Sequence, residues 1–125
     1  MHSMEESTSV PTERMEGFFY AFLELLPRHF MDHHDIPFYA DKLGITAIYL
    51  SRIVKQRTGR TVVDLINERL LEEASWLLRN TDMPIVKIAE HLHFADNANF
   101  TRFFSRLKGV TPKAYRNREK LTLPY

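Results

Sequence analysis

The stretch Thr61–Asn80 has the sequence TVVDLINERLLEEASWLLRN and decides the fold that we expect for this chain. Its apolar residues recur at steps of three and four, the period of one buried helix face. They are Val62, Val63, Ile66, Leu70, Ala74, Leu77 and Leu78, with Leu65 and Trp76 widening the stripe. The positions expected to face water are Asp64, Glu68, Glu72, Glu73 and Ser75. Because neither glycine nor proline interrupts it, the stretch predicts one helix of roughly 30 Å.

The composition excludes several classes of protein. Of the 125 residues, 44% are hydrophobic, which is enough for the core of one domain or of two very small ones. No apolar run is long enough to span a membrane, and the first residues lack the features of a signal peptide. The absence of cysteine removes disulfides, thiolate nucleophiles and cysteine-ligated zinc. We therefore expect a cytoplasmic protein.

The formal net charge of +1 conceals an uneven distribution of charge. Residues 1–44 carry three basic and eight acidic side chains, whereas residues 45–125 carry fourteen and eight. The basic residues concentrate in 46–60, which has four and no acid, and in 97–120, which has seven and one acid. Two patches of the same sign, one on each side of the long helix, favour a polyanionic partner over an ordinary mixed surface.

An amphipathic helix is expected to begin at Thr12 or Glu13 and to lose its regular form at Pro27. The polar residues 1–12 before it are interpreted as a flexible tail or a cloning remnant. Its apolar side is formed by Met15, Phe18, Phe19, Phe22, Leu25 and Leu26. We expect this side to pack in the core, with an exposed dimer or domain contact as the alternative.

A helix-turn-helix pattern follows this first helix. Asp35 and Pro37 open a short helix that ends at a turn containing Gly44. Thr46 then caps a second helix, residues 46–58, which Gly59 closes.

The same pattern returns after the long helix. A short helix over 85–92 follows Asp82 and Pro84, and Asp96 caps a second helix over 96–108. The alignment at an offset of 50 pairs Leu50, Ser51, Arg52, Ile53, Val54 and Gly59 with Phe100, Thr101, Arg102, Phe103, Phe104 and Gly109. Thr111 and Pro112 begin a last helix. An internal repeat of this kind indicates two copies of one structural unit.

These patterns predict an all-α protein of about seven helices, since no segment has the alternation typical of a strand. The expected organisation has a first helix-turn-helix subdomain at 13–60, a linker helix at 61–80, a second subdomain at 81–120 and a tail at 121–125.

The early turns of the second helix in each copy are the candidate DNA contacts, because a helix in the major groove contacts base edges from those turns. Arginine can donate two hydrogen bonds to guanine, asparagine pairs with adenine, and isoleucine or alanine meets the thymine methyl group. The candidates in the first copy are Thr46, Ala47, Ile48, Tyr49, Ser51, Arg52 and Lys55. Those in and after the second are Asn97, Asn99, Thr101, Arg102, Arg106 and Lys113.

Each candidate has a simpler alternative. Arg52 and Arg102 would otherwise form surface salt bridges, and the asparagines and Thr101 would be solvated polar positions. Ile48 and Tyr49 would otherwise pack against a neighbouring helix. The basic side chains expected to neutralise DNA phosphates are Lys55, Arg57, Arg60, Arg106, Lys108, Lys113 and Arg116.

The run Ile85–Arg116, IVKIAEHLHFADNANFTRFFSRLKGVTPKAYR, resembles the signature of the AraC/XylS-type transcription regulators. The shared skeleton consists of Phe94, Phe100, Arg102, Phe104, Gly109, Thr111, Pro112, Tyr115 and Arg116. The segments ADKLGITAIYLSRIVKQRTGRT and RLLEEASWLL resemble that family's first helix-turn-helix and its linker helix. Two departures are His93, which stands at a turn position where glycine is usual, and the pair Ala98 and Asn99, where larger groups are common.

The resemblance implies a two-unit, homeodomain-like domain with both recognition helices in successive major grooves on one side of double-stranded DNA. Successive major-groove faces lie about 34 Å apart, and the linker helix would hold the two recognition helices at that spacing. It also implies activation through RNA polymerase, association with the nucleoid, and a separate effector or dimerisation domain missing from this chain. Because few residues precede the first helix, we expect a shortened form or a small stand-alone member.

Other functions have weaker support in the sequence. His29 and His33 have a spacing that can chelate a metal, but nothing supplies the remaining ligands, and we expect neither a metal site nor a cofactor. No Gly-rich phosphate loop, nucleophile with a base, or paired carboxylates indicate an enzyme. The alternative from another class is a helical protein-interaction or dimerisation module that pairs through the Met15–Leu26 face.

Overall fold

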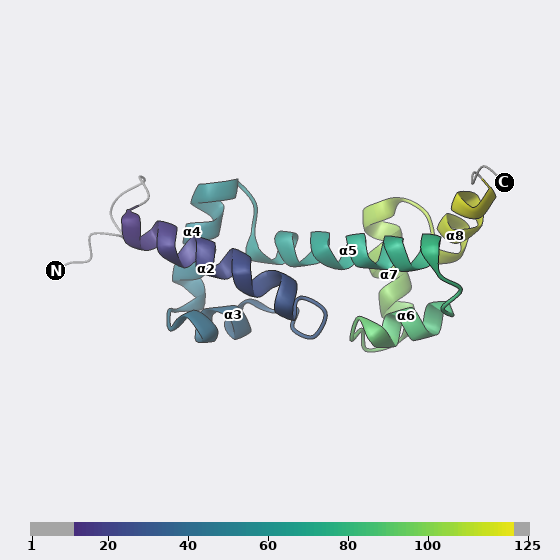
Figure 1. The fold of residues 1–125 in the computed structure, drawn as a ribbon, viewed down its shortest axis with the longest axis horizontal. Coiled ribbons are helices and arrows are strands. Elements are labelled where there is room, and N and C mark those ends of the chain that lie inside the picture. Colours follow the sequence, from purple (N-terminus) through teal and green to yellow (C-terminus); the bar gives the residue numbers. More distant parts are fainter. Residues whose placement is uncertain (1–11, 122–125) are drawn as a thin grey trace. The chain divides into compact units, whose positions relative to one another are not determined.

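The computed structural model describes residues 12–121, which form seven α-helices and no strand (Figure 1). The helices are α2 (Glu13–His29), α3 (Ile36–Leu43), α4 (Ala47–Thr58), α5 (Val62–Asn80), α6 (Ile85–His91), α7 (Asn97–Lys108) and α8 (Pro112–Leu121). The all-α class expected from the sequence is confirmed. Most of the two expected tails, residues 1–11 and 122–125, lies outside the described residues. Within the described part, no helix is long and apolar enough to cross a membrane.

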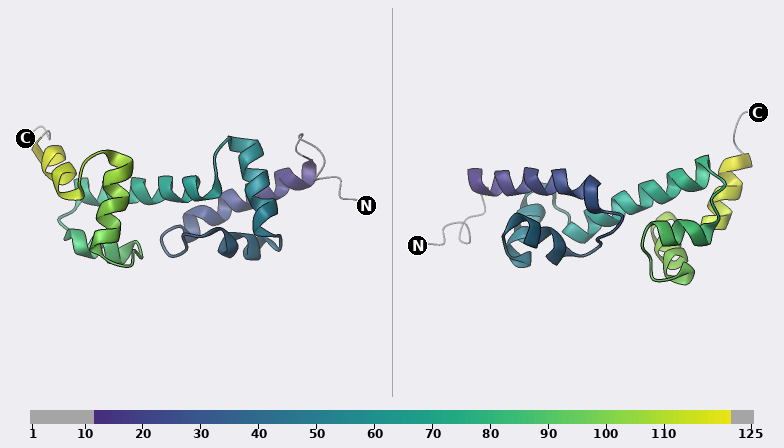
Figure 2. Two further views of the ribbon diagram at one scale, coloured as in Figure 1. Left: turned by 180° about the vertical axis from the view of Figure 1, so that it is seen from behind. Right: turned by 60° about the horizontal axis from the view of Figure 1, so that its bottom comes forward.

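The helices group into two compact units, one through Glu68 and one from Arg69. In the first unit α2, α3 and α4 pack against one another (Figure 2). Its core holds the ring of Phe22 edge-on to the ring of Tyr39, with 5.6 Å between the centroids. The Tyr39 hydroxyl donates a hydrogen bond of 2.8 Å to the carbonyl of His33, which satisfies the one polar group of this buried side chain.

The apolar side of α2 packs inward, as the sequence predicts. Met15, Phe19, Phe22 and Leu26 are buried, so the larger part of the Met15–Leu26 face is core and does not form a docking surface. The expectation for Pro27 is wrong in detail, because α2 continues through it to His29. Proline lacks the N–H that would continue the helical bonding, but the bonding is in place beyond it, with Phe30 N–H bonded to Leu26 O at 2.9 Å.

The long helix α5 begins one residue later than the quoted stretch, after a reciprocal cap. The Thr61 hydroxyl accepts from Asp64 N–H at 3.0 Å, and the Asp64 carboxylate accepts from Thr61 N–H at 3.2 Å. Hydrogen bonding to the Asp64 carboxylate by the backbone N–H of Thr61, and then by its side chain, holds the pKa of Asp64 below its usual value. The cap explains why the helix starts at Val62.

The buried face of α5 is not the single straight stripe that the sequence pattern suggests. Val63 and Trp76, placed in the stripe, are 40% and 51% exposed, whereas Ser75, placed in water, is 4% exposed. The buried positions follow steps of four residues, Val62, Ile66, Leu70, Ala74 and Leu78. Each step of four turns by about 40° on a helix of 3.6 residues per turn. The buried face therefore rotates around α5 from one end to the other.

In the second unit α6, α7 and α8 pack around a cluster of aromatic rings. Phe104 lies 5.4 Å from Tyr115 and 6.0 Å from Phe100 between ring centroids. Arg79, near the end of α5, donates to the Tyr115 hydroxyl at 3.0 Å. Arg116 donates through Nε to the carbonyl of Leu78 at 3.0 Å. These bonds attach α8 to the C-terminal end of α5.

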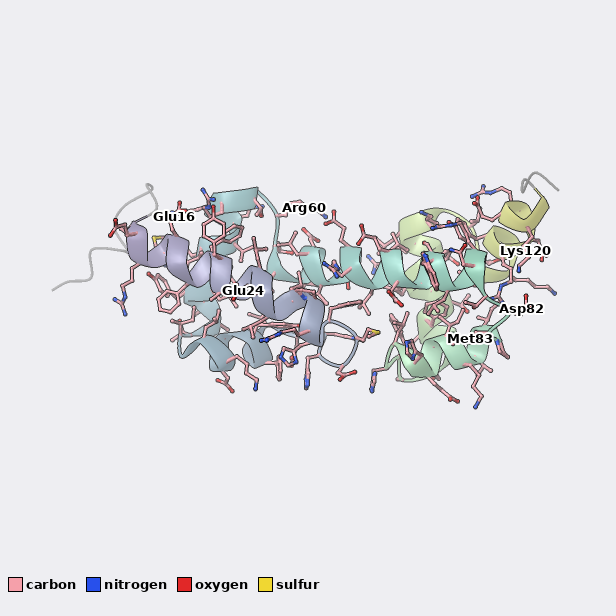
Figure 3. The ribbon with its side chains drawn as sticks, in the orientation of Figure 1. Glu16, Glu24, Arg60, Asp82, Met83 and Lys120 are labelled. Atoms are coloured by element: carbon pink, nitrogen blue, oxygen red, sulfur yellow. The ribbon has the colours of Figure 1, made fainter. Side chains whose placement is uncertain are left out.

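Asp82 does not cap α6, although the parallel with Asp35 in the first copy of the pattern suggested that it would. Its carboxylate pairs with Lys120 Nζ at 3.1 Å, and both side chains are labelled in Figure 3. The residue at the N-cap position of α6 is Pro84, and no side chain caps the helix there. In the first copy, Asp35 does occupy the N-cap position of α3, although its side chain makes no capping bond.

Candidate nucleic-acid interface

The first candidate recognition helix, α4, has one buried face and one exposed face. Thr46 caps it through a hydrogen bond of 3.1 Å from Tyr49 N–H to its hydroxyl, as expected. Leu50, Ile53 and Val54 are completely buried. Ile48 is 74% exposed in the first turn. An aliphatic side chain so exposed at the start of a capped helix suits contact with a thymine methyl group.

The other candidates of α4 occupy more varied surroundings. The ring of Tyr49 is half-buried and packs edge-on against Phe18 of α2, with 6.1 Å between centroids. Ala47, Ser51 and Arg52 are half-buried. Lys55 is exposed and donates a hydrogen bond of 3.0 Å to the carbonyl of Gly59. Of the two candidates for which packing was the alternative, Ile48 faces water and Tyr49 packs against the neighbouring helix.

The second candidate helix, α7, repeats this arrangement. Asp96 caps it, accepting from Asn99 N–H at 2.8 Å, and the three phenylalanines Phe100, Phe103 and Phe104 are buried. Four of the candidates lie on its other faces, with Asn97 and Arg102 exposed and Asn99 and Thr101 half-buried. Arg106, later in the helix, and Lys113, at the start of α8, are also exposed.

One contact on α7 was not foreseen. Arg102 Nη2 donates a hydrogen bond to Asn99 Oδ1, which lies one turn earlier on the same face. Spacing by three residues brings such side chains together on a helix, so the signal was present in the sequence. It could not be distinguished there from two independent polar residues.

In the turn before α7, His93 has a φ of +63°, the left-handed conformation that favours glycine. Phe94 N–H bonds to Ala89 O at 2.9 Å, and His93 N–H bonds to Glu90 O at 3.0 Å. The first copy has the same pair of bonds around Gly44, whose φ is +72°. This arrangement ends a helix through one residue in the left-handed region. The two turns are therefore structural repeats that differ in having histidine or glycine at that residue.

Four of the basic residues assigned to phosphates contact another helix of the protein, whereas Lys55 bonds to the carbonyl at the end of its own helix. Arg57 pairs with Glu16 at 3.2 Å, and its guanidinium lies 5.0 Å from the ring centroid of Phe19. The others are Arg60, paired with Glu68, Lys108, over the ring of Tyr115, and Arg116, bonded to carbonyls at the end of α5. Position in the sequence gives no sign of these partners, which come from other helices or from the far side of a turn.

The histidine pair is part of an aromatic cluster. His33 stacks on Phe38, with 3.6 Å between ring centroids and 3° between planes, and His29 meets the same ring edge-on. Among the described residues, no group of three or more potential ligand side chains is placed to hold a metal ion.

Comparison with known proteins agrees with this geometry. Residues 39–118 match the model of a family described as a helix-turn-helix domain. Regulatory protein SoxS from Escherichia coli (strain K12) is 36% identical over 91 residues, which cover 70% of this chain and 85% of SoxS. The chain is also 28% identical over 105 residues to YobQ, an uncharacterized transcriptional regulator of Bacillus subtilis, but it spans only 44% of YobQ.

Solved structures share the fold. The C-terminal domain of AraT, a response regulator from Geobacillus stearothermophilus, superposes with a TM-score of 0.78 at 29% identity, covering 85% of this chain and 88% of that domain. The DNA-binding domain of AdpA, solved with a target DNA, gives 0.71 at 19% identity over 88% and 96% of the chains, a likeness of fold. The chain belongs to the AraC/XylS family of helix-turn-helix transcription regulators, which bind specific DNA sequences and are not enzymes.

Proposed function

We propose that this chain binds double-stranded DNA by placing α4 and α7 in successive major grooves, and that it regulates transcription in this way. One observation carries the proposal. Each of these helices buries its apolar face and presents an exposed polar or aliphatic group in its first two turns, Ile48 on α4 and Arg102 on α7. That is the geometry by which a helix-turn-helix contacts base edges.

The proposed base contacts are divided between the two helices. Arg52 and Arg102 occupy the same repeat position, one in each copy, and arginine is the side chain most suited to guanine. Ile48 would meet a thymine methyl group. The further contacts, with bases or the backbone, are Thr46, Ala47, Tyr49, Ser51, Asn97, Asn99 and Thr101.

Phosphate contacts would come from exposed basic residues that do not contact another helix. Lys55, Arg106 and Lys113 are the candidates that remain from the larger set, since Arg57, Arg60, Lys108 and Arg116 contact other helices, whereas Lys55 bonds to the carbonyl of Gly59 at the end of its own helix. Phosphate neutralisation releases counterions, so affinity should fall with salt.

Linkage of the two units through α5 supports simultaneous binding. This helix is continuous from Val62 to Asn80, and a helix of that length spans roughly 28 Å, close to the separation of about 34 Å between successive major-groove faces. We further propose that the protein acts in the cytoplasm, on the nucleoid, as an activator that contacts RNA polymerase. An effector or dimerisation domain would act with it in a longer protein.

The test compares the wild-type protein with an Arg52→Ala, Arg102→Ala double variant. We expect the wild type to bind random duplex DNA at low salt and to select a defined site from a random pool, and the double variant to lose that selection. Each good arginine–guanine contact contributes about 1 to 3 kcal/mol of discrimination. A wild type that binds no duplex, or a double variant that selects the same site with the same affinity, would contradict the proposal.

A further inference from the structure

The two candidate recognition helices hold their equivalent arginines differently. On α7, Arg102 is bonded to the side-chain oxygen of Asn99, three residues earlier. On α4, the residue three before Arg52 is Tyr49, whose ring packs against Phe18. The second copy thus has an amide acceptor next to its arginine, where the first copy has a half-buried aromatic ring that packs against α2.

The bond to Arg102 determines which way the side-chain amide of Asn99 faces. Its backbone N–H is bound to the capping carboxylate of Asp96 at 2.8 Å, and its side chain is half-buried. Arginine has only donors, so the atom of the amide that faces Arg102 is the oxygen. The amide nitrogen, with its two donors, then points away from the guanidinium.

We propose that Asn99 is a positioning residue for Arg102, and that the two side chains together present only hydrogen-bond donors to an acceptor-rich edge of the major groove. This inference rests on the proposed function of α7 and specifies its ligand. Arg102 would donate to guanine O6 and N7, and Asn99 Nδ2 would donate to an acceptor on a neighbouring base, such as guanine O6 or thymine O4.

The chemistry of the amide excludes the simpler expectation for Asn99. Bidentate pairing of asparagine with adenine requires the amide oxygen to face the adenine amino group. In this structure that oxygen faces the guanidinium of Arg102. Holding a long, flexible arginine before DNA arrives also lowers the entropy lost on contact.

In the experiment, each of four variants selects binding sites from a random pool of DNA duplexes. The Arg102→Ala variant identifies the base pair that Arg102 contacts, because the preference at that base pair is lost. We expect Asn99→Ala to weaken the preference for guanine at that base pair by roughly fivefold or more. Asn99→Asp keeps the acceptor and should preserve that preference, while losing the preference at the neighbouring base pair because its donors are gone. Asn97→Ala is the control on the same helix turn: it removes a proposed contact of its own and should leave the preference at the base pair of Arg102 unchanged.

An unchanged guanine preference in Asn99→Ala would overturn the inference. A second measurement, on the free protein, separates its failure from failure of the proposed function. Nuclear magnetic resonance of the Arg102 guanidinium should show greater side-chain mobility in Asn99→Ala than in the wild type. Equal mobility would show that Asn99 does not hold Arg102. Failure of the wild type to select any site would instead reject the proposed function.

Discussion

At the scale of single residues, Tyr39 shows how a polar group is accommodated in the small core of the first unit. Tyr39 is fully buried, and its hydroxyl is bonded to the carbonyl of His33. Burial chiefly, with the nearby charges of Asp35 and Asp32, raises the pKa of Tyr39 to about 12. The neutral hydroxyl is therefore the form that the folded state stabilises.

We predict that Tyr39→Phe lowers the free energy of unfolding by about 0.5 to 1.5 kcal/mol at neutral pH, because the His33 carbonyl loses its partner. The raised pKa gives the sign of the pH effect. An unfolded tyrosine ionises near pH 10, whereas the folded one keeps its proton to about pH 12. The stability that the wild type gains is thus complete below pH 10 and lost between pH 10 and 12. Chemical denaturation across that range should show the difference between the two proteins narrowing, and a constant difference would contradict the prediction.

At the scale of elements, the turns and caps explain where the helices start and stop. Capping by Thr46 and Asp96, and the helix ends at Gly59 and Gly109, follow directly from residue type. His93 is the exception, because it takes a left-handed conformation that costs most residues about 1 to 2 kcal/mol. The surrounding hydrogen bonds of the turn keep it there.

We predict that His93→Gly raises the free energy of unfolding by about 0.5 to 1 kcal/mol, since the relief of strain exceeds the added freedom of the unfolded chain. The repeat provides a reciprocal control. Gly44 has a φ of +72° and open space around a Cβ at that position, so Gly44→His should destabilise the protein through its backbone alone. If His93→Gly is destabilising in thermal unfolding, the histidine has stabilising contacts that outweigh the strain.

At the scale of the whole molecule, basic residues divide into those that stabilise the fold and those available to DNA. Arg57 connects α4 to α2 through Glu16 and through the ring of Phe19. Arg106 is exposed on α7. From the sequence, both residues were expected to contact DNA phosphates, because a run of positive charge does not reveal which side chains already have partners within the protein.

We predict opposite effects for Arg57→Ala and Arg106→Ala. The first should lower the free energy of unfolding by about 1 kcal/mol, through loss of a cation–π contact and an exposed ion pair, and leave the salt dependence of DNA binding unchanged. The second should leave stability within about 0.5 kcal/mol and reduce the slope of log affinity against log salt by about 0.9. Binding titrations at several salt concentrations measure both slopes, and a reduced slope for Arg57→Ala would return that residue to the DNA contacts.

The sequence by itself determined the all-α class, the seven helices and the two copies of one helix-turn-helix pattern. These features depend on neighbours within a few residues: apolar periodicity, capping side chains and turn residues act locally. The candidate contacts of α4 and α7 could be named for the same reason, since position within a capped helix fixes which side it faces.

Only the tertiary structure decided which side of each helix is buried and which is exposed. The buried face of α5 rotates, burying Ser75 and exposing Trp76, because the surface that covers each turn of a helix comes from elsewhere in the chain. Likewise, Arg116 caps α5 at residues almost forty positions earlier. Contacts between residues far apart in sequence depend on how the helices pack, and that information is not contained in any local pattern.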